Sequence, residues 1–220
     1  MLKTIAKHEF HKLLDTLPAY HEHLVDNPKS LLTRYYGLHK IKYLKKGRTQ
    51  EQYVIIMNNM FRNFSPDIKY DLKGSSLGRT TTFKDGKRDA TIALKDNDFL
   101  DDNRVVDINQ EDKEQLQSIL RKDSEYLGNN ATLDYSLLLG VVDLEKLREK
   151  HKDKPEAFDN DDPVLQLLKG NSKIKDRGIY VSSNEKEVYV IGIIDTLTNY
   201  TTMKKMEYYY KRCQHGHEMS

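Results

Sequence analysis

The chain has 220 residues, of which 37% are hydrophobic and 32% are charged, so it can bury one core but is short for two domains. The formal net charge is only +2, and no long basic stripe with interleaved aromatics is present, so a nucleic-acid partner is not expected. The single cysteine, Cys213, favours a reducing compartment. No apolar run reaches the roughly 20 residues that would span a bilayer. A cytoplasmic protein is therefore expected.

The first quarter of the chain predicts a strand, a helix and a hairpin. Residues 1–5 are typical of the end of a strand. Four apolar side chains then recur at helical spacing: Phe10, Leu13, Leu14 and Leu17. Pro18 is expected to interrupt or restart this helix, which ends near Asn27-Pro28. Strand-like stretches at 35–44 and 53–57 flank a charged stretch that contains Gly47, which indicates a hairpin.

The rest of the chain continues with short strands and helices. A strand is expected at 70–73, an irregular polar stretch at 81–107, and an amphipathic helix at 109–127 that Gly128 ends. An apolar segment at 133–142 precedes a charged helix and loop. Three further elements complete the chain, namely a hairpin from 178–182 and 188–194 and a tyrosine-rich helix at 203–212. The fold class is therefore predicted as α+β, with antiparallel sheets and packed helices.

Three short segments contain residues suited to phosphate chemistry: Asp71-Leu72-Lys73-Gly74-Ser75, Leu133-Asp134-Tyr135-Ser136 and Ile193-Ile194-Asp195. A glycine after a strand lets the backbone approach a phosphate, and an adjacent lysine supplies positive charge. An aspartate at the end of an apolar strand can bind Mg²⁺, which prefers carboxylate and phosphate oxygens. Taken singly, such a segment is more often a plain surface turn or a helix cap.

Together the segments resemble the phosphatidylinositol phosphate kinases. The sequences "YDLKGSS", "LDYSLLLG" and "IGIIDTLTNY" occur in this order and at roughly the spacing of that family. Further similar stretches are "LKTIAKHE" and "NPKSLLTRYYGL" near the start, "VIIMNN", "KDNDFL" and "KKMEYYYK". The resemblance covers nearly the whole chain and is weakest at about 145–177. It implies a two-lobed kinase-like fold, with a partial small lobe at 1–57 and a large lobe at 58–220.

The resemblance implies a nucleotide site for ATP and Mg²⁺. Lys3 matches the lysine that holds the nucleotide phosphates, and Glu9 is the candidate to steady it. The backbone of Met57 and Asn58 is expected to contact adenine, and Asp195 to bind the metal. Lys3 could instead be a plain surface lysine, and Asp195 a cap.

The resemblance also implies the residues that face the lipid. Lys73 is expected near the transferred phosphate, and Asp134 is expected to orient or deprotonate the inositol hydroxyl. Arg79 lies where the family uses a basic residue toward the lipid phosphate, although a plain exposed arginine is the alternative. The activation segment would cover about 196–220, where Lys204 and Lys205 suit an anionic membrane surface. A soluble helix with its tyrosines in the core is the alternative there.

Glu207 indicates the substrate. It falls where kinases resembling the phosphatidylinositol 4-phosphate 5-kinases, the type I class, have glutamate and the 4-kinases have alanine, although kinases acting on the 3-phosphate are similar there. The expected reaction therefore converts phosphatidylinositol 4-phosphate to the 4,5-bisphosphate at the cytoplasmic face of a membrane, with the plasma membrane expected. Two other readings are a non-catalytic phosphoinositide-binding scaffold and a soluble inositol polyphosphate kinase.

The resemblance starts at the lysine that contacts ATP and stops within the activation segment. The family's glycine-rich loop and final helices have no counterpart in the sequence, so a chain truncated at both ends, with an incomplete small lobe and weak or no activity, is expected.

Overall fold

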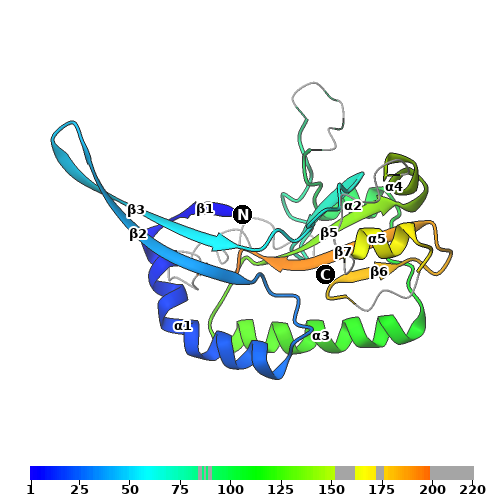
Figure 1. Ribbon diagram of the computed structural model, residues 1–220, viewed down its shortest axis with the longest axis horizontal. Helices are drawn as coiled ribbons and strands as arrows, with labels where there is room; N and C mark the ends of the chain where they lie inside the picture. Colours follow the sequence, from blue (N-terminus) through cyan, green and yellow to red (C-terminus); the bar gives the residue numbers. More distant parts are fainter. Residues whose placement is uncertain (84–85, 87, 89–90, 152–161, 172–175, 199–220) are drawn as a thin grey trace, which may run out of the picture.

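The structure is a computed structural model that describes residues 1–83, 86, 88, 91–151, 162–171 and 176–198. Two antiparallel sheets pack with helices (Figure 1), which confirms the predicted α+β class. The sheets are formed by successive parts of the chain, and they divide between residues 57 and 68. Among the described residues, no helix is long and apolar enough to cross a membrane.

The first sheet contains three strands in the order β1 (Leu2–Ile5), β3 (Arg48–Met57) and β2 (Tyr35–Lys45). Helix α1 (Lys7–Asp26) packs against one face of it. Leu13 of this helix shares a buried cluster with Ile55, and the Phe10 ring lies 4.9 Å from the Tyr53 ring. These apolar contacts fix α1 beside the strand that contains Lys3.

Two features of α1 differ from the prediction. The helix runs without a break through Pro18, because contacts along its length outweigh the hydrogen bond that proline removes. Leu14 and Leu17 are 46% and 44% exposed, so the predicted apolar stripe is only half buried. Its buried face also includes Tyr20, whose hydroxyl donates to the Thr33 carbonyl at 2.8 Å.

The predicted hairpin is present, but its strands are longer than expected. The charged stretch between the two apolar segments is itself strand, and the turn contains only Lys46 and Gly47. Both turn residues have positive φ, at 51° and 70°, as a type I′ turn requires. The hairpin therefore extends well beyond the rest of the sheet (Figure 1).

The second sheet contains β4 (Ile68–Leu72), β5 (Ser136–Asp143), β7 (Glu187–Ile194) and β6 (Ile179–Val181), in that order. Helix α3 (Gln110–Asn129) covers one face and packs on side chains such as Leu139 and Ile191. Helices α4 (Leu144–His151) and α5 (Pro163–Leu168) cover the other face. Alternate residues of β5 and β7 face the two helical layers, so both faces of the sheet are buried.

The short helices were the least predictable elements. Helix α2 (Asp96–Asp101) lies in the stretch expected to be irregular, and α5 lies in the expected charged loop. Each has six residues, too few to show a helical period. The sequence does mark the start of α5, since Asp162 accepts a hydrogen bond from Val164 N at 2.8 Å and Pro163 follows as the first helical residue.

Candidate active site

The strand register brings three of the predicted site residues to one end of the second sheet. Leu72, the last residue of β4, pairs with Leu137, and Ser136, the first residue of β5, pairs with Ile194 at the end of β7. Lys73 and Asp195 directly follow their strands, and Asp134 lies two residues before its strand. Neighbouring strands are about 4.8 Å apart, so residues far apart in sequence meet at this end.

Both aspartates have an unusual backbone conformation. Asp134 and Asp195 each have φ of 58°, in the left-handed region that non-glycine residues seldom adopt. Their loops are also joined, because Leu133 N donates to the Thr198 carbonyl at 3.1 Å. Both side chains reach the surface. Such backbone outliers are concentrated at functional sites, where the surrounding structure holds them.

Lys3 joins the first sheet to this site. Its Nζ lies 3.1 Å from Oδ1 of Asp195, and the two side chains are 51% and 44% exposed. The pairing of Lys3 with Ile55 places its side chain on the face covered by α1. The lysine and aspartate, 192 residues apart in sequence, are therefore in direct contact.

The segment after Asp195 is held by the first sheet and by α1. The hydroxyl groups of Tyr35 and Thr196 lie 2.8 Å apart, and Leu197 is buried with Leu13 and Ile55. Burial raises the pKa of the Tyr35 hydroxyl, which stays a neutral partner for Thr196. The position of Asp195 therefore depends on the packing of α1.

Glu9 does not contact Lys3. Its carboxylate accepts a hydrogen bond from Ala6 N at 2.7 Å, so in this structure it caps the start of α1. The expectation that Glu9 steadies Lys3 was wrong for this conformation, in which Asp195 takes that place.

Asp96 organises the loop that contains Lys73. Its Oδ1 accepts hydrogen bonds from the backbone N–H groups of Lys73, Gly74 and Ser75, at 3.0, 2.8 and 3.4 Å. Burial opposes the charge, but these donors and the Arg79 guanidinium outweigh it, so the pKa of Asp96 is lowered. The exposed Lys73 side chain is thus part of a loop whose backbone is held by hydrogen bonds to Asp96. Sequence reasoning missed Asp96, although it lies in the family-like stretch 95–100.

Arg79 braces the same loop. Its Nε lies 2.8 Å from Oδ2 of Asp96, and its Nη2 donates to the carbonyl and, at 3.4 Å, to the carboxylate of Asp71. The side chain is only 15% exposed, so it is not the plain exposed arginine of the alternative reading. In this conformation the guanidinium is bound inside the loop, to Asp96 and Asp71, and the expected role of Arg79 toward the lipid phosphate stays a prediction.

The expected adenine contacts are occupied by protein groups. Met57 N donates to the Met1 carbonyl, and Asn58 N donates to the Arg34 carbonyl, both at 2.9 Å. No described residue accepts from the backbone N–H groups of Asn59 and Met60, which come next in the chain. The backbone N–H groups that could face a nucleotide therefore belong to the segment after β3, just past the predicted pair.

Two glycines let the segment after Met57 lie on the second sheet. A side chain at Gly192 would overlap the Met60 side chain, and one at Gly140 would approach Phe61 to 2.5 Å. Because these positions on β5 and β7 are glycines, the segment after Met57 can pack directly on the sheet.

The carboxylates present suit magnesium. Oδ1 of Asp195 binds Lys3, and no described residue is bound to Oδ2. Magnesium needs only one or two carboxylates besides the phosphates of its substrate, and the exposed Asp195 carboxylate is of that kind. The described residues contain no cluster of three or more candidate ligands.

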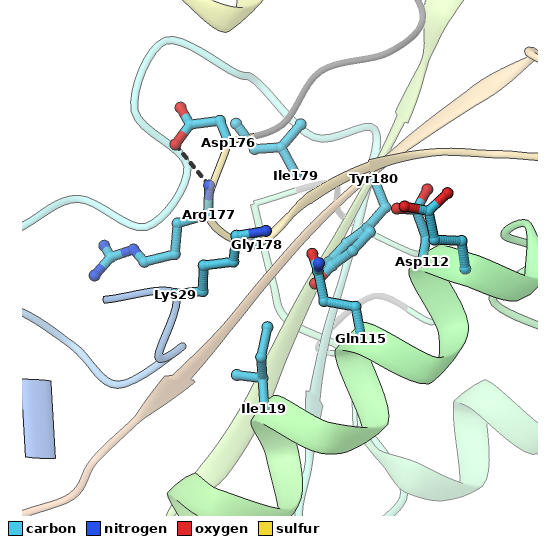
Figure 2. A pocket seen from close by; sticks show the side chains of 10 residues that line it. Lys29, Asp112, Gln115, Ile119, Asp176, Arg177, Gly178, Ile179 and Tyr180 are labelled. Atoms are coloured by element: carbon cyan, nitrogen blue, oxygen red, sulfur yellow. Dashed lines mark hydrogen bonds between the residues drawn. The ribbon is translucent and has the colours of Figure 1, made fainter. Parts of the chain in front are cut away.

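A pocket elsewhere is not part of this site. Figure 2 shows Lys29, Asp112, Gln115 and Tyr180 around a hollow between α3 and the loop before β6. Its side chains are of mixed charge, and it includes none of the predicted catalytic residues. Burial, together with the neighbouring cations Arg34 and Arg62, lowers the pKa of Arg177 at its edge to about 10.

Several predicted residues lie outside the described part of the chain. Lys204, Lys205 and Glu207 belong to 199–220, as do Cys213, the expected helix at 203–212 and most of the expected activation segment. Their predicted roles remain predictions.

A family described as phosphatidylinositol-4-phosphate 5-kinase matches residues 1–220. The chain belongs to this family. Members of the phosphatidylinositol-4-phosphate 5-kinase family similar to it include the phosphatidylinositol 4-phosphate 5-kinase of Plasmodium falciparum (isolate 3D7), 36% identical over 226 residues. The phosphatidylinositol 5-phosphate 4-kinase type-2 alpha of Sus scrofa is 30% identical over 243 residues.

These alignments cover 97% and 98% of the chain but only 13% and 59% of the two relatives. The chain thus spans less than two thirds of the length of either protein. What the comparison establishes is membership of the family.

Proposed function

We propose that this member of the phosphatidylinositol-4-phosphate 5-kinase family uses ATP and Mg²⁺ to phosphorylate the inositol ring of a phosphatidylinositol monophosphate. The contact between Lys3 and Asp195 carries the proposal, because it joins two sheets at the sheet end where Lys73 and Asp134 also lie. Phosphoryl transfer depends on positioning and charge rather than on covalent help from the protein, and this arrangement supplies both.

Each residue has a part in the proposed reaction. Lys3 binds the nucleotide phosphates, and Lys73 adds positive charge beside the transferred phosphoryl group. Asp134 accepts a hydrogen bond from the attacking inositol hydroxyl and orients it, and takes its proton during transfer. Asp195 would hold magnesium, which when bound would neutralise charge on the phosphate oxygens. Adenine binds at Met57–Met60. The backbone N–H groups of Met57 and Asn58 already donate to protein carbonyls, so those of Asn59 and Met60 would donate to adenine.

The proposed substrate is phosphatidylinositol 4-phosphate, and the product is the 4,5-bisphosphate. Two observations favour this: Glu207, and the identity of 36% with a protein named phosphatidylinositol 4-phosphate 5-kinase against 30% with a 5-phosphate 4-kinase. The lipid headgroup would be reached at an anionic surface on the cytoplasmic side of a membrane, to which Lys204 and Lys205 contribute.

The test is transfer of label from ATP to vesicles that hold each phosphatidylinositol monophosphate in turn. Asp134→Asn and Asp195→Asn are each expected to lower the rate about 100-fold or more, because they remove the hydroxyl acceptor and the metal ligand. Glu149→Gln, an exposed carboxylate on α4, is the matched control and should leave the rate unchanged.

The same assay distinguishes the other readings. Label on free inositol phosphates in the absence of vesicles would indicate a soluble inositol polyphosphate kinase. Binding of the lipid without any transfer of label would indicate a scaffold. Label on the 5-phosphate lipid in preference to the 4-phosphate lipid would refute the proposed role of Glu207.

A further inference from the structure

The β2–β3 hairpin has an outer part that no other element supports. β1 pairs with β3 only at residues 53–56, so Ile41–Lys45 and Arg48–Gln52 pair solely with each other. Every residue from 39 to 52 is exposed. Five residue pairs at about 3.4 Å each reach about 17 Å past the three-stranded sheet. Figure 1 shows this ribbon projecting beyond α1 and the remainder of the fold.

The ribbon is strongly basic in a nearly neutral chain. Residues 40–52 contain five cationic side chains and a single carboxylate, whereas the whole chain has a net charge of only +2. That carboxylate, Glu51, is bound by Lys40 at 2.8 Å and Lys42 at 3.7 Å. No described residue offers a carboxylate to the three cations at the tip: Lys45, Lys46 and Arg48. The tip therefore presents uncompensated positive charge.

Large apolar side chains accompany this charge. Leu44, beside the turn, is 77% exposed, and Ile41 and Tyr43 are 46% and 39% exposed. In a strand, successive side chains point to opposite faces, so both faces of the tip carry an apolar group. Lysines alone could be explained as charges that keep an open sheet edge from pairing with a strand of another chain. That explanation does not account for the exposed Leu44 side chain.

The turn itself also favours a role for charge. Lys46 has φ of 51°, in a turn position that asparagine or glycine occupies more easily. A lysine in this unfavourable conformation places a cation at the most projecting point of the hairpin. Two-stranded ribbons are also marginally stable in water, so contact with a partner would stabilise this one.

We infer that the tip of the β2–β3 hairpin, Ile41–Lys45 with Lys46–Gln52, binds an anionic lipid bilayer. The inference rests on the proposed function, which places the substrate in such a bilayer. The cations attract anionic headgroups, and Leu44 and Tyr43 enter the region between headgroups and acyl chains. The hairpin thereby provides a membrane contact separate from the residues that bind the phosphoinositide.

The experiment measures sedimentation of the chain with phosphatidylcholine vesicles that contain phosphatidylserine but no phosphoinositide, in the absence of ATP. The hairpin variant is Lys45→Gln, Lys46→Asn and Arg48→Gln combined. Each basic residue near an anionic surface contributes about fivefold to binding, so the triple change is expected to weaken it on the order of 100-fold. A matched control removes three exposed cations from α3 instead: Lys113→Gln, Arg121→Gln and Lys122→Gln.

A second variant tests the apolar component. Leu44→Ser is expected to weaken binding about tenfold. This difference from the wild type should be the same at low and high salt, because salt screens charges alone. Thermal unfolding followed by circular dichroism verifies that all variants are folded. Asparagine fits the positive φ of Lys46, so the hairpin variant keeps its turn.

Three results would overturn the inference. They are binding of the hairpin variant equal to that of the α3 control, equal binding of the wild type to vesicles without phosphatidylserine, and no binding of the wild type at all. The last result would instead favour an acidic protein as the partner of the hairpin. Hairpin-dependent binding in a chain that transfers no phosphate to any lipid would refute the proposed function alone.

Discussion

Asp123 is expected to be the most important single polar residue for stability among the described residues. Its side chain is fully buried on α3, where Oδ1 lies 2.7 Å from His23 Nε2 on α1 and Oδ2 accepts from Leu31 N at 2.7 Å. The His23 ring also stacks on Tyr126, with centroids 4.6 Å apart. One carboxyl group thus connects α1, α3 and the segment that leads to β2.

Asp123→Ala should lower the free energy of unfolding by about 3–5 kcal/mol, because it leaves the Leu31 N–H and His23 without their buried partner. Asp123→Asn keeps one carbonyl oxygen and should cost about 1.5–3 kcal/mol, the value of one charged hydrogen bond. Small domains have about 5–15 kcal/mol in total, so the alanine variant would lose a large share.

Urea unfolding measures both changes, with the m-value expected to stay constant. Glu125→Ala, an exposed position on the same helix, is the control and should stay within about 0.5 kcal/mol of the wild type. If Asp123→Ala lay within about 1 kcal/mol of the wild type, the network would not hold the two helices together and the reasoning would fail.

Three further predictions concern the loops around the sheet. Gly178→Ala should lower the free energy of unfolding in urea by about 3 kcal/mol or more, because the φ of Gly178 is 71° and a Cβ there would lie 2.2 Å from the Ile191 carbonyl oxygen. Gly170→Ala, at a residue with φ of 80° and open space around it, should cost only about 1–2 kcal/mol. Equal losses for the two variants would exclude the clash. Because the pKa of Asp96 is lowered in the folded state, its carboxylate stabilises the fold above the unfolded pKa near 3.8, and this stabilisation is lost as the pH falls through the lower folded pKa. Asp96→Asn should therefore flatten the acid side of a plot of unfolding free energy against pH. An unchanged acid side would contradict this. Arg79→Lys should lower stability by about 2 kcal/mol, because lysine cannot contact both carboxylates that the guanidinium bridges, and an unfolding midpoint equal to that of the wild type would refute the bracing role.

The sequence was most informative where apolar residues follow a clear pattern. The long helix that begins near residue 109 was predictable because burial of one face imposes a helical period on its apolar side chains, and the strand at 188–194 because it is a short continuous apolar run. The Lys3–Asp195 contact could be expected only through the resemblance to the family, since nothing in the local sequence connects residues 192 apart.

Three features could not be predicted for physical reasons. The continuation of α1 through Pro18 depends on tertiary contacts that outweigh local propensity. The roles of Asp96 and Arg79 arise from a loop whose shape a sequence does not show. The capping contact of Glu9 is local, but its N-cap residue is Ala6 rather than the serine or threonine that marks such a cap in a sequence.

The antiparallel register also determines where the family can vary in length. Asp134 and Asp195 lie at one end of β5 and β7, and Asp143 and Glu187 lie at the other end, where Asp143 leads directly into α4. An insertion beside α4 would therefore be about one strand length from Asp134 and Asp195 and would leave their separation unaltered. The alignment with the Sus scrofa kinase runs over 243 positions against 220 residues in this chain. We expect the additional residues to accumulate at that far end, where they would leave the residues of the proposed active site in place.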